Sequence, residues 1–322
     1  MDGQVAHQQI QSAGNNHRWA LVLAAGDGTR LQPLTAGAGR PTPKQFCSLL
    51  GGRTLLEQAL ERAGRNVPKA NQVSVVAAQH QEWWRRDLRQ LPPGNVVVQP
   101  KNRGTAAGIL LPLLEILQRD PEARLLVLPS DHFVADERVL SAAIEDAFEA
   151  LEAEPERVFL LGISPDDEDG EYGWILPRAG SVARAAAVET FVEKPGKAAA
   201  SALRQQGAVW NSFLFVAKAA TLLELFEEHL PELVRELDPN AADLSALYQQ
   251  LESSDFSRQV LEKSAEALRL VVVPPCGWSD LGTPERVLRC LEQHGRPAPA
   301  RRRLPSLRRG PSPFVLASAL FA

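Results

Sequence analysis

LAAGDGTRLQPLTAGAGRPTPKQF, residues 23–46, joins the end of an apolar run to a loop rich in glycine, proline and positive charge. Arg30 and Lys44 stand fourteen residues apart in it, and Asp27 is its only acid. Glycine allows backbone N–H groups to form a concave anion-binding nest, to which the two cations add charge. The segment therefore predicts a phosphate-binding loop directly after a buried strand.

The first half of the chain alternates short apolar runs with helical patterns. The runs are nearly continuous and rich in β-branched residues, which is typical of strands covered on both faces of a parallel sheet. These predicted strands span 19–25, 73–78, 95–99 and 124–131. The predicted helices span 54–66, 80–91, 105–118 and 136–154, and Thr54 with Glu57 forms a capping-box signature. We expect an α/β fold of three layers around a mostly parallel, doubly wound, Rossmann-like central sheet.

After residue 155 the alternation loosens. Further strands are predicted at 157–163, 172–177, 187–194, 208–216 and 268–275, with helices from Lys218 to about His229 and from Thr283 onward. No linker rich in glycine, proline or serine divides residues 19–295, so one domain is expected there. Residues 1–18 are expected to be a disordered leader. Residues 296–322, with six arginines and no acid, are expected to be a basic, disordered tail.

Composition narrows the class of protein. Of the 322 residues, 44% are hydrophobic and 23% charged, as in ordinary globular proteins, and the net charge of −4 gives no reason to expect nucleic acid. No apolar run approaches the roughly 20 residues of a membrane span. The three cysteines form no C-x-x-C pair, which favours a reducing cytoplasm. The helices between 218 and 265 are compatible with a homodimer surface and equally with a simple cap on the sheet.

The loop matches neither of two well-known phosphate-binding motifs. Gly26 and Gly28 begin like the dinucleotide fingerprint G-x-G-x-x-G, but Leu31 takes the place of the third glycine and no acid ends a second strand about twenty residues later. The Walker A pattern fails because Lys44 lies between Pro43 and Gln45. Neither a hydride-transfer enzyme nor a P-loop NTPase is favoured.

Charged residues follow several of the predicted strands. Asp131 ends one of them, Glu193 and Lys194 end another, and Asp280 comes shortly after the last. Open α/β sheets bind ligands at the carboxyl ends of their strands. Mg²⁺ is commonly held by one or two carboxylates together with phosphate oxygens. The pattern indicates a cation-bridged polyphosphate site.

The segments AAGDGTRLQPLT, PKQF, PSDH, VEKP, VWNSFLF and WSDLGT, in this order, resemble the sugar-1-phosphate nucleotidyltransferases. They are most similar to mannose-1-phosphate guanylyltransferases, also called GDP-mannose pyrophosphorylases, and the resemblance covers residues 19 to about 290. It implies the nucleotide-diphospho-sugar transferase fold, with a mixed β part that binds the sugar. It also implies transfer of a nucleotidyl group from a nucleoside triphosphate, with GTP expected, to a sugar-1-phosphate, with mannose-1-phosphate expected, and release of pyrophosphate.

The resemblance implies roles for individual residues. Catalysis would fall to Arg30, Lys44, Asp131, Lys194 and Asp280, with Mg²⁺ held by Asp131 and Asp280. The nucleotide would lie against Leu23, Ala24, Ala25, Gly26, Gly28, Thr29, Gln99, Asn102, Arg103, Gly104 and Thr105. The sugar and its phosphate would lie against Gly173, Glu193, Lys194 and Asn211.

Two departures keep alternatives open. The family usually has R-N-T-A-P where this chain has the segment Asn102–Ala106, and it often has glycine where this chain has Phe213. One alternative is the same reaction with another triphosphate and sugar, giving a UDP-, ADP- or dTDP-sugar. The other is a non-catalytic subunit that binds a nucleotide sugar. Such a subunit is expected to lose the five charged catalytic residues, and all five are present.

Other polar and aromatic residues have simpler interpretations. A phosphate nucleophile is already ionised and needs no general base, so we expect His132 to pack or hydrogen-bond a neighbouring loop. Trp174, Trp210 and Trp278 stand in motif segments but are expected to be buried for their area. Asp27 is expected to point away from the phosphates.

Overall fold

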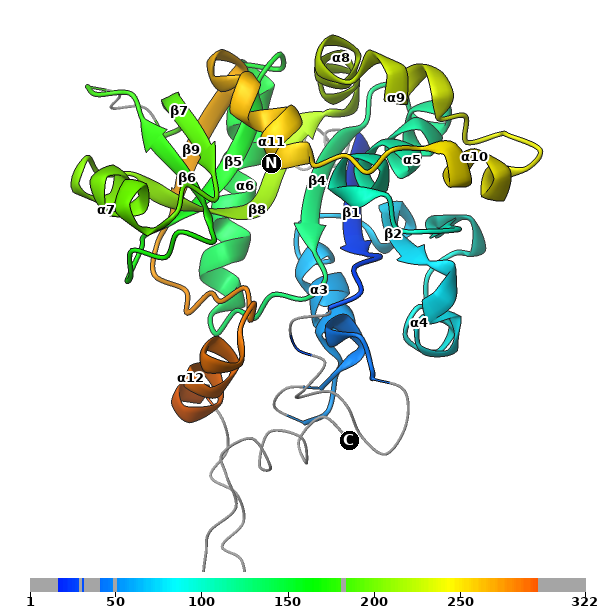
Figure 1. Cartoon of the computed structure of the whole chain (residues 1–322), viewed down its shortest axis with the longest axis horizontal. Helices are drawn as coiled ribbons and strands as arrows, with labels where there is room; N and C mark the ends of the chain where they lie inside the picture. The colour runs from blue at the N-terminus through cyan, green and yellow to red at the C-terminus, as the bar shows by residue number, and fades with distance from the viewer. Residues whose placement is uncertain (1–16, 29–30, 32–40, 49–50, 181–183, 295–322) are drawn as a thin grey trace, which may run out of the picture.

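The computed structural model describes residues 17–28, 31, 41–48, 51–180 and 184–294 (Figure 1). The predicted tail and residues 1–16 of the predicted leader lie outside this range. The described part begins slightly earlier than the predicted domain, because β1 starts at Arg18 and the Nδ1 atom of His17 lies 2.9 Å from the Oδ1 atom of Asp120.

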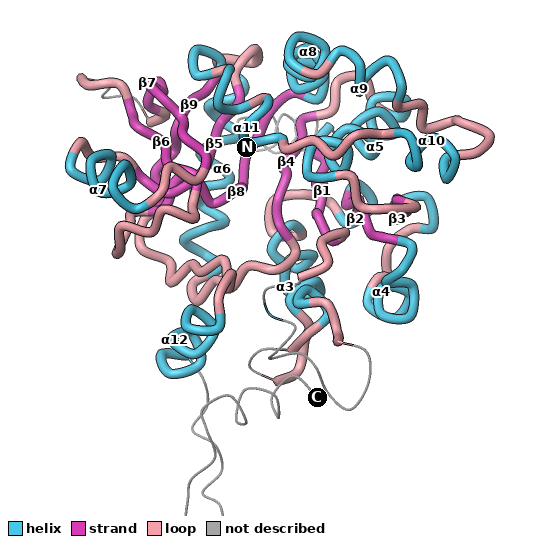
Figure 2. The backbone as a smooth tube through the Cα atoms, in the orientation of Figure 1, coloured by secondary structure: helices cyan, strands magenta, loops and turns pink. Residues whose placement is uncertain are grey.

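The described residues form a nine-stranded sheet with the order β3-β2-β1-β4-β8-β5-β9-β7-β6. The strands are β1 (Arg18–Ala24), β2 (Gln72–Ala77), β3 (Val96–Gln99), β4 (Arg124–Pro129), β5 (Val158–Ile163), β6 (Gly173–Pro177), β7 (Ala186–Glu193), β8 (Val209–Lys218) and β9 (Leu268–Val273). Each one overlaps a strand predicted from the sequence. Figure 2 shows them in magenta, running through the middle of the molecule.

The sheet is mixed, and the expectation of a mostly parallel sheet holds only for β3-β2-β1-β4. Strand β8 runs antiparallel to both β4 and β5, and β6 and β7 make only antiparallel pairs. In the second half, only β5 and β9 pair in parallel. A buried strand is apolar in either direction, so the sequence pattern does not reveal its direction.

Helices cover both faces of the sheet (Figure 1). The described α-helices are α3 (Leu55–Ala63), α4 (Gln81–Asp87), α5 (Gly104–Arg119), α6 (Glu137–Ala153), α7 (Lys197–Gln205), α8 (Ala219–His229), α9 (Pro231–Glu236), α10 (Leu244–Gln250), α11 (Phe256–Gln259) and α12 (Pro284–His294). The capping box predicted at the start of α3 is confirmed, since the Thr54 hydroxyl accepts from the Glu57 N–H and the Glu57 carboxylate accepts from the Thr54 N–H. No helix in the described part of the chain is long and apolar enough to cross a membrane.

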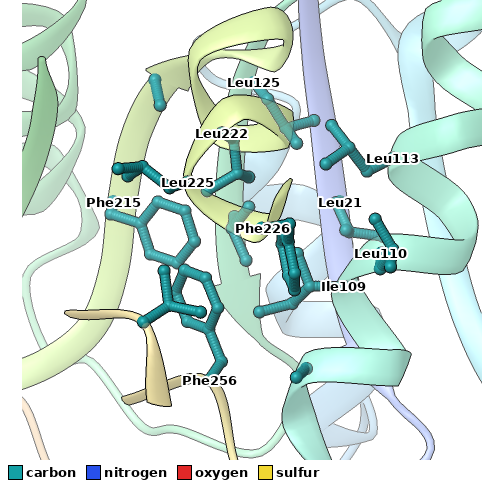
Figure 3. Close-up of a cluster of buried hydrophobic side chains, with 14 of the residues drawn as sticks. Leu21, Ile109, Leu110, Leu113, Leu125, Phe215, Leu222, Leu225, Phe226 and Phe256 are labelled. Carbon is teal, nitrogen blue, oxygen red and sulfur yellow. The ribbon is translucent and has the colours of Figure 1, made fainter. Parts of the chain in front are cut away.

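The core has two large clusters, one on each face of β1. Trp19 and Leu21 belong to the cluster that includes α5 and α8, whereas Ala20 and Val22 belong to the one with α3 and α6. Alternate residues of a strand face opposite sides of a sheet, so β1 is buried on both. Figure 3 shows the first cluster, where Leu21 of β1 lies beside Leu110 of α5, side chains of α8 belong to the same cluster, and Phe215 of β8 packs near Phe256. This arrangement confirms the three layers predicted for this half of the chain.

Candidate active site

A cavity of about 440 Å³ lies where the two halves of the sheet meet. Ten of the residues predicted for the site line it: Leu23, Ala25, Gly26, Gln99, Asn102, Gly104, Thr105, Asp131, Glu193 and Lys194. The wall also contains residues that were not among the predicted site residues, some of them inside the motif segments: Gln45, Val75, Gly108, Pro129, Ser130, His132, Phe213, Asp255 and Ser257. The structure therefore brings the glycine-rich segment and the Glu193–Lys194 pair to one hollow, from opposite halves of the chain.

The end of β1 is held by side chains from other segments. The Gln45 amide donates through Nε2 to the carbonyl oxygens of Ala24 (3.0 Å) and Gly26 (2.8 Å). The Ser130 hydroxyl donates to the carbonyl oxygen of Leu23 (2.6 Å). These bonds fix the backbone from Leu23 to Gly26, at the start of the loop. Gln45 stands inside the PKQF motif, so its position was a signal for this contact.

Gly28 shows why this loop needs glycine. Its backbone has a φ of +60°, and a Cβ there would lie 3.1 Å from the backbone nitrogen of Lys44. Glycine at this position therefore allows both the left-handed turn and the close approach of the Lys44 backbone. The predicted residues Thr29 and Arg30 lie outside the described part of the chain.

Lys44 links the two halves of the site. Its side chain is buried, and Nζ lies 2.8 Å from the Oδ2 atom of Asp131 and 2.6 Å from the carbonyl oxygen of Asp280. Burial opposes the ionisation of Asp131, but the Lys44 ammonium, together with His132 and a backbone hydrogen bond, holds the pKa of the carboxyl below its ordinary value. Three residues predicted from separate motifs are thus brought together.

The Asp280 carboxylate faces away from Lys44, toward residues that the sequence did not indicate. Its Oδ1 atom accepts from the Tyr172 hydroxyl (2.8 Å), and Arg286 of α12 donates to both of its oxygens. Arg286 also pairs with Asp169 and lies over the Tyr172 ring, 4.1 Å from its centroid. Arg286 follows the WSDLGT motif by only a few residues, and this proximity was the one sequence signal that it belongs near the site. Asp280 does not line the cavity, whereas Asp131 does.

Of the two predicted magnesium ligands, Asp131 is better placed to bind the ion than Asp280. Asp131 presents a partly exposed carboxylate to the cavity, which suits a hard cation that also takes phosphate oxygens. The Asp280 carboxylate is paired with Arg286. No group of three or more metal-ligating side chains occurs among the described residues, so Mg²⁺ would depend on phosphate oxygens for much of its coordination.

The sugar end of the predicted site centres on Glu193. Its carboxylate lies 3.3 Å from the Lys194 ammonium, and burial raises the pKa of Glu193 above its ordinary value despite that cation. Gly173 lies against this side chain, since a Cβ there would be 2.7 Å from the Glu193 Oε2 atom and 3.2 Å from the Asn211 Cβ atom. The structure thus groups Gly173, Glu193, Lys194 and Asn211, although Gly173 and Asn211 stand behind the cavity wall rather than in it.

At the other end of the cavity, two predicted nucleotide contacts have partners within the chain. The Arg103 guanidinium donates to the carbonyl oxygens of Tyr248 and Gln249, both at 2.7 Å. The Thr105 hydroxyl accepts from the backbone N–H of Phe256 (2.8 Å). These side chains attach residues 248–256 to the start of α5. Thr105 still lines the cavity and Arg103 does not.

Comparison with known proteins identifies the family. The family model described as Nucleotidyl transferase matches residues 19–294. The chain belongs to the nucleotidyl transferase family. It is 34% identical over 293 residues to the xanthan biosynthesis protein XanB of Xanthomonas campestris pv. campestris (strain B100), covering 85% of this chain and 60% of that protein.

Two further relatives carry more specific names. The mannose-1-phosphate guanylyltransferase of Escherichia coli (strain K12) is 33% identical over 292 residues, covering 82% of this chain and 58% of that protein. The solved structure of a mannose-1-phosphate geranyltransferase from Thermus thermophilus is 35% identical, with a TM-score of 0.71, and the match covers 83% of this chain and 76% of that one. The mixed α/β fold is therefore that of known nucleotidyl transferases. The chain spans about 60% of the length of the curated relatives named here.

Strained backbone is concentrated in the site of this nucleotidyl transferase. Among the described residues, the non-glycine residues with positive φ are Lys194 (51°), Phe213 (60°) and Leu281 (50°). Lys194 and Phe213 line the cavity, and the Leu281 carbonyl oxygen lies 3.4 Å from the Lys44 ammonium. Phe213 adopts a conformation that glycine takes without cost. Such strain persists where the surrounding structure imposes it, and it clusters at functional sites.

Several residues have the contacts within the chain that their simpler interpretations predict. His132 is buried and accepts a hydrogen bond from the Trp278 indole N–H (3.3 Å), and burial lowers its pKa to about 4. Trp174 and Trp210 are buried in one cluster, and Trp278 is partly buried against it. The Asp27 carboxylate accepts from the Gln79 amide (3.0 Å) and does not line the cavity.

Proposed function

We propose that this nucleotidyl transferase uses the cavity to join a nucleoside triphosphate, GTP, to mannose-1-phosphate, giving GDP-mannose and pyrophosphate. The observation that carries the proposal is that one cavity is lined by the glycine-rich loop and Gln99 from one half of the chain and by Glu193 and Lys194 from the other. The names of the Escherichia coli and Thermus thermophilus relatives support mannose-1-phosphate as the sugar substrate.

In the proposed reaction, an oxygen of the sugar phosphate attacks the α-phosphorus of the triphosphate. The new P–O bond forms as the bond from the α-phosphorus to the bridging oxygen breaks, and pyrophosphate leaves with that electron pair. No proton has to move, because the attacking phosphate is already ionised at pH 7. The obstacle is repulsion between two anions, so catalysis would rest on positioning and charge stabilisation.

Each positive group then has a defined task. Lys194, which lines the cavity beside Glu193, would neutralise the incoming sugar phosphate. Arg30 would contact the triphosphate as a planar fork and Lys44 as a point charge. Lys44 is already bonded to Asp131, so nucleotide binding would compete with this ion pair.

We assign Mg²⁺ to Asp131 and Asp280, with triphosphate oxygens as the other ligands. When bound, the ion would offset the negative charge that develops on the reacting phosphate. Entry of Asp280 into this site requires its carboxylate to turn from Arg286, while Asp131 needs no such movement.

The second candidate function is the same reaction with a different nucleotide or sugar, and two features support it. Gly104 replaces the usual family residue beside the predicted base site, and the Phe213 side chain occupies space where relatives often have glycine. A regulatory subunit without activity is disfavoured because Lys44, Asp131, Lys194 and Asp280 are all present. Asp131 and Lys194 line the cavity, and Lys44 contacts both Asp131 and the backbone of Asp280.

The test is pyrophosphate release with Mg²⁺, pairing GTP, UTP, ATP and dTTP with mannose-1-phosphate and glucose-1-phosphate. We expect signal chiefly from GTP with mannose-1-phosphate. Lys194→Met should lower kcat/KM at least about 100-fold. Lys218→Met is the matched control, because Lys218 is equally exposed but pairs with Glu122 away from the cavity. Absence of release from every pair would overturn the proposal, and preference for another pair would move it to the second candidate.

A further inference from the structure

The carboxylate of Asp280, one of the two proposed magnesium ligands, already accepts several hydrogen bonds from the chain. The Nη1 atom of Arg286 lies 2.9 Å from its Oδ1 atom and 2.8 Å from its Oδ2 atom. Oδ1 also accepts from the Tyr172 hydroxyl (2.8 Å) and from the backbone N–H of Gly282 (3.0 Å). A carboxylate oxygen has about two acceptor sites, so Oδ1 is saturated. A cation can bind this oxygen only in place of one of these donors, and the Arg286 charge repels it.

Arg286 has a second anionic partner. Its Nη2 atom pairs with Asp169, and its guanidinium lies over the Tyr172 ring, 4.1 Å from the centroid. The Arg286 side chain is only 12% exposed, and a charge so buried is costly to leave unpaired. Asp169 removes that cost, because it keeps Arg286 neutralised when the Asp280 carboxylate turns away.

The backbone of Asp280 is held separately from its side chain. Its carbonyl oxygen accepts from the Lys44 ammonium (2.6 Å), and the same ammonium lies 2.8 Å from the Oδ2 atom of Asp131. The backbone of Asp280 therefore stays beside the Asp131 carboxylate whichever way its own carboxylate points. Rotation of one side chain decides whether Asp280 binds Arg286 or shares a cation with Asp131.

We propose that Arg286 is a positioning residue that competes with the metal ion for the Asp280 carboxylate, with Asp169 as the partner that retains it. This inference rests on the proposed function, which assigns Mg²⁺ to Asp131 and Asp280. The free enzyme then binds the ion weakly, through Asp131 alone. Phosphate oxygens of a bound triphosphate strengthen the binding of the ion and offset the loss of the Asp280–Arg286 pair. Metal binding and nucleotide binding are thereby coupled.

The experiment measures the Kd for Mn²⁺, the probe used for Mg²⁺, from the loss of the electron paramagnetic resonance signal of free Mn²⁺ with no substrate present. Arg286→Met frees the Asp280 carboxylate. We expect Mn²⁺ to bind at least about tenfold more tightly, the effect of removing one charged, hydrogen-bonded competitor. Asp169→Asn should weaken Mn²⁺ binding about threefold, because Arg286 then depends on Asp280 alone. General loosening of the fold would not move the two variants in opposite directions.

Arg289→Met and Asp166→Asn are the matched controls. They change the net charge as the two test variants do, on the same helix and in the same loop. Arg289 pairs with Asp166 at 3.8 Å, and neither has a hydrogen bond or ion pair with Asp280 in the described chain. Their Kd values should stay within about twofold of the wild type, since exposed charges are screened by solvent.

In an Asp280→Asn background, Arg286→Met should leave the Kd unchanged, because it releases no carboxylate. Equal tightening in that background, or no tightening in Arg286→Met itself, would overturn the inference. If circular dichroism shows that Arg286→Met does not fold, Tyr172→Phe replaces it. That variant removes one donor to Asp280 and should tighten Mn²⁺ binding about threefold, and an unchanged Kd would again overturn the inference. These titrations need no turnover, so a failure to release pyrophosphate would overturn the proposed function and leave the Kd values to decide this inference.

Discussion

Lys44 shows how much of this site depends on single residues. Its ammonium is buried between the carboxylate of Asp131 and the carbonyl oxygen of Asp280, which come from segments far apart in the chain. A buried charge is tolerated only where it is paired and hydrogen-bonded. The residue therefore supports the fold as well as the proposed chemistry, and these two roles can be separated by mutation.

Lys44→Met should lower the free energy of unfolding by about 1–3 kcal/mol, since it leaves the Asp131 carboxylate without its cation. The lower part of this range is expected because the Asp131 side chain is 35% exposed and solvent screens it. Adding Asp131→Asn should restore about half of the loss but none of the activity. Urea denaturation together with the pyrophosphate assay measures both, and a Lys44→Met protein as stable as the wild type would contradict this account.

His132 gives a pH dependence of stability. Its Nδ1 atom accepts from the Trp278 N–H, so a proton there would break that bond, and burial holds the pKa near about 4 against 6.5 for an ordinary histidine. Between pH 6.5 and about 4, His132 is therefore protonated in the unfolded chain but neutral in the folded protein. The contribution of His132 to the free energy of unfolding is fully present above pH 6.5. It is lost as the pH falls toward 4, and the total loss is about 3 kcal/mol.

The measurement is urea denaturation at pH 7.5 and pH 5 with EDTA present, in the wild type and in His132→Asn. Asparagine can accept from Trp278 but does not titrate, so its stability should change less between the two pH values. The other histidines contribute equally to both proteins and cancel in the difference. Equal pH dependence of the two proteins would show that His132 is not held neutral.

At the scale of elements, the start of α5 depends on close backbone contact with the segment before α11. The Ser254 N–H donates to the Arg103 carbonyl oxygen, and the Ala106 N–H donates to the Ser254 carbonyl oxygen, both at 3.0 Å. Gly104 lies between these bonds with a φ of +86°, and a Cβ there would come within 2.2 Å of the Ser254 oxygen. This contact explains why glycine stands at position 104.

Gly104→Ala should cost about 2–4 kcal/mol of stability, because it combines a left-handed backbone with a clash against backbone atoms that cannot yield easily. Gly207→Ala separates the two effects: its φ is +88°, yet a Cβ meets nothing within 4 Å, so about 1 kcal/mol is expected. Gly94→Ala, with neither feature, should be close to neutral. Chemical denaturation ranks the three, and equal losses for Gly104→Ala and Gly207→Ala would argue against the clash.

At the scale of the whole molecule, the cysteines report on how the structure opens. Cys47, Cys276 and Cys290 are free and buried. Burial raises the pKa of all three thiols, to about 12 for Cys47 and about 11 for Cys290. Only the thiolate reacts readily with alkylating reagents, so the native protein should be almost inert to them at pH 8.

Labelling with iodoacetamide at rising urea concentration, followed by mass spectrometry, should modify Cys290 first. It lies on α12, the last helix of the described chain, whereas Cys47 and Cys276 pack in or beside the large cluster that includes β1 and should react only on global unfolding. Rapid modification of all three in native buffer would contradict the burial described here.

Sequence alone determined the features that depend on near neighbours in the chain. The apolar runs marked each strand, Thr54 and Glu57 marked the start of α3, and the motif segments supplied ten residues of the cavity wall. Local propensity, capping and the burial pattern act over a few residues, and they can therefore be interpreted without a structure.

Only the tertiary structure decided how distant segments meet. It placed β8 antiparallel between β4 and β5, paired Asp280 with Arg286 and Tyr172, and turned Arg103 toward α10 rather than into the cavity. It also brought the Tyr248 hydroxyl to the Gln99 amide across 149 residues. These contacts arise from packing whole layers against each other, and a buried polar group takes whichever partner that packing leaves within reach.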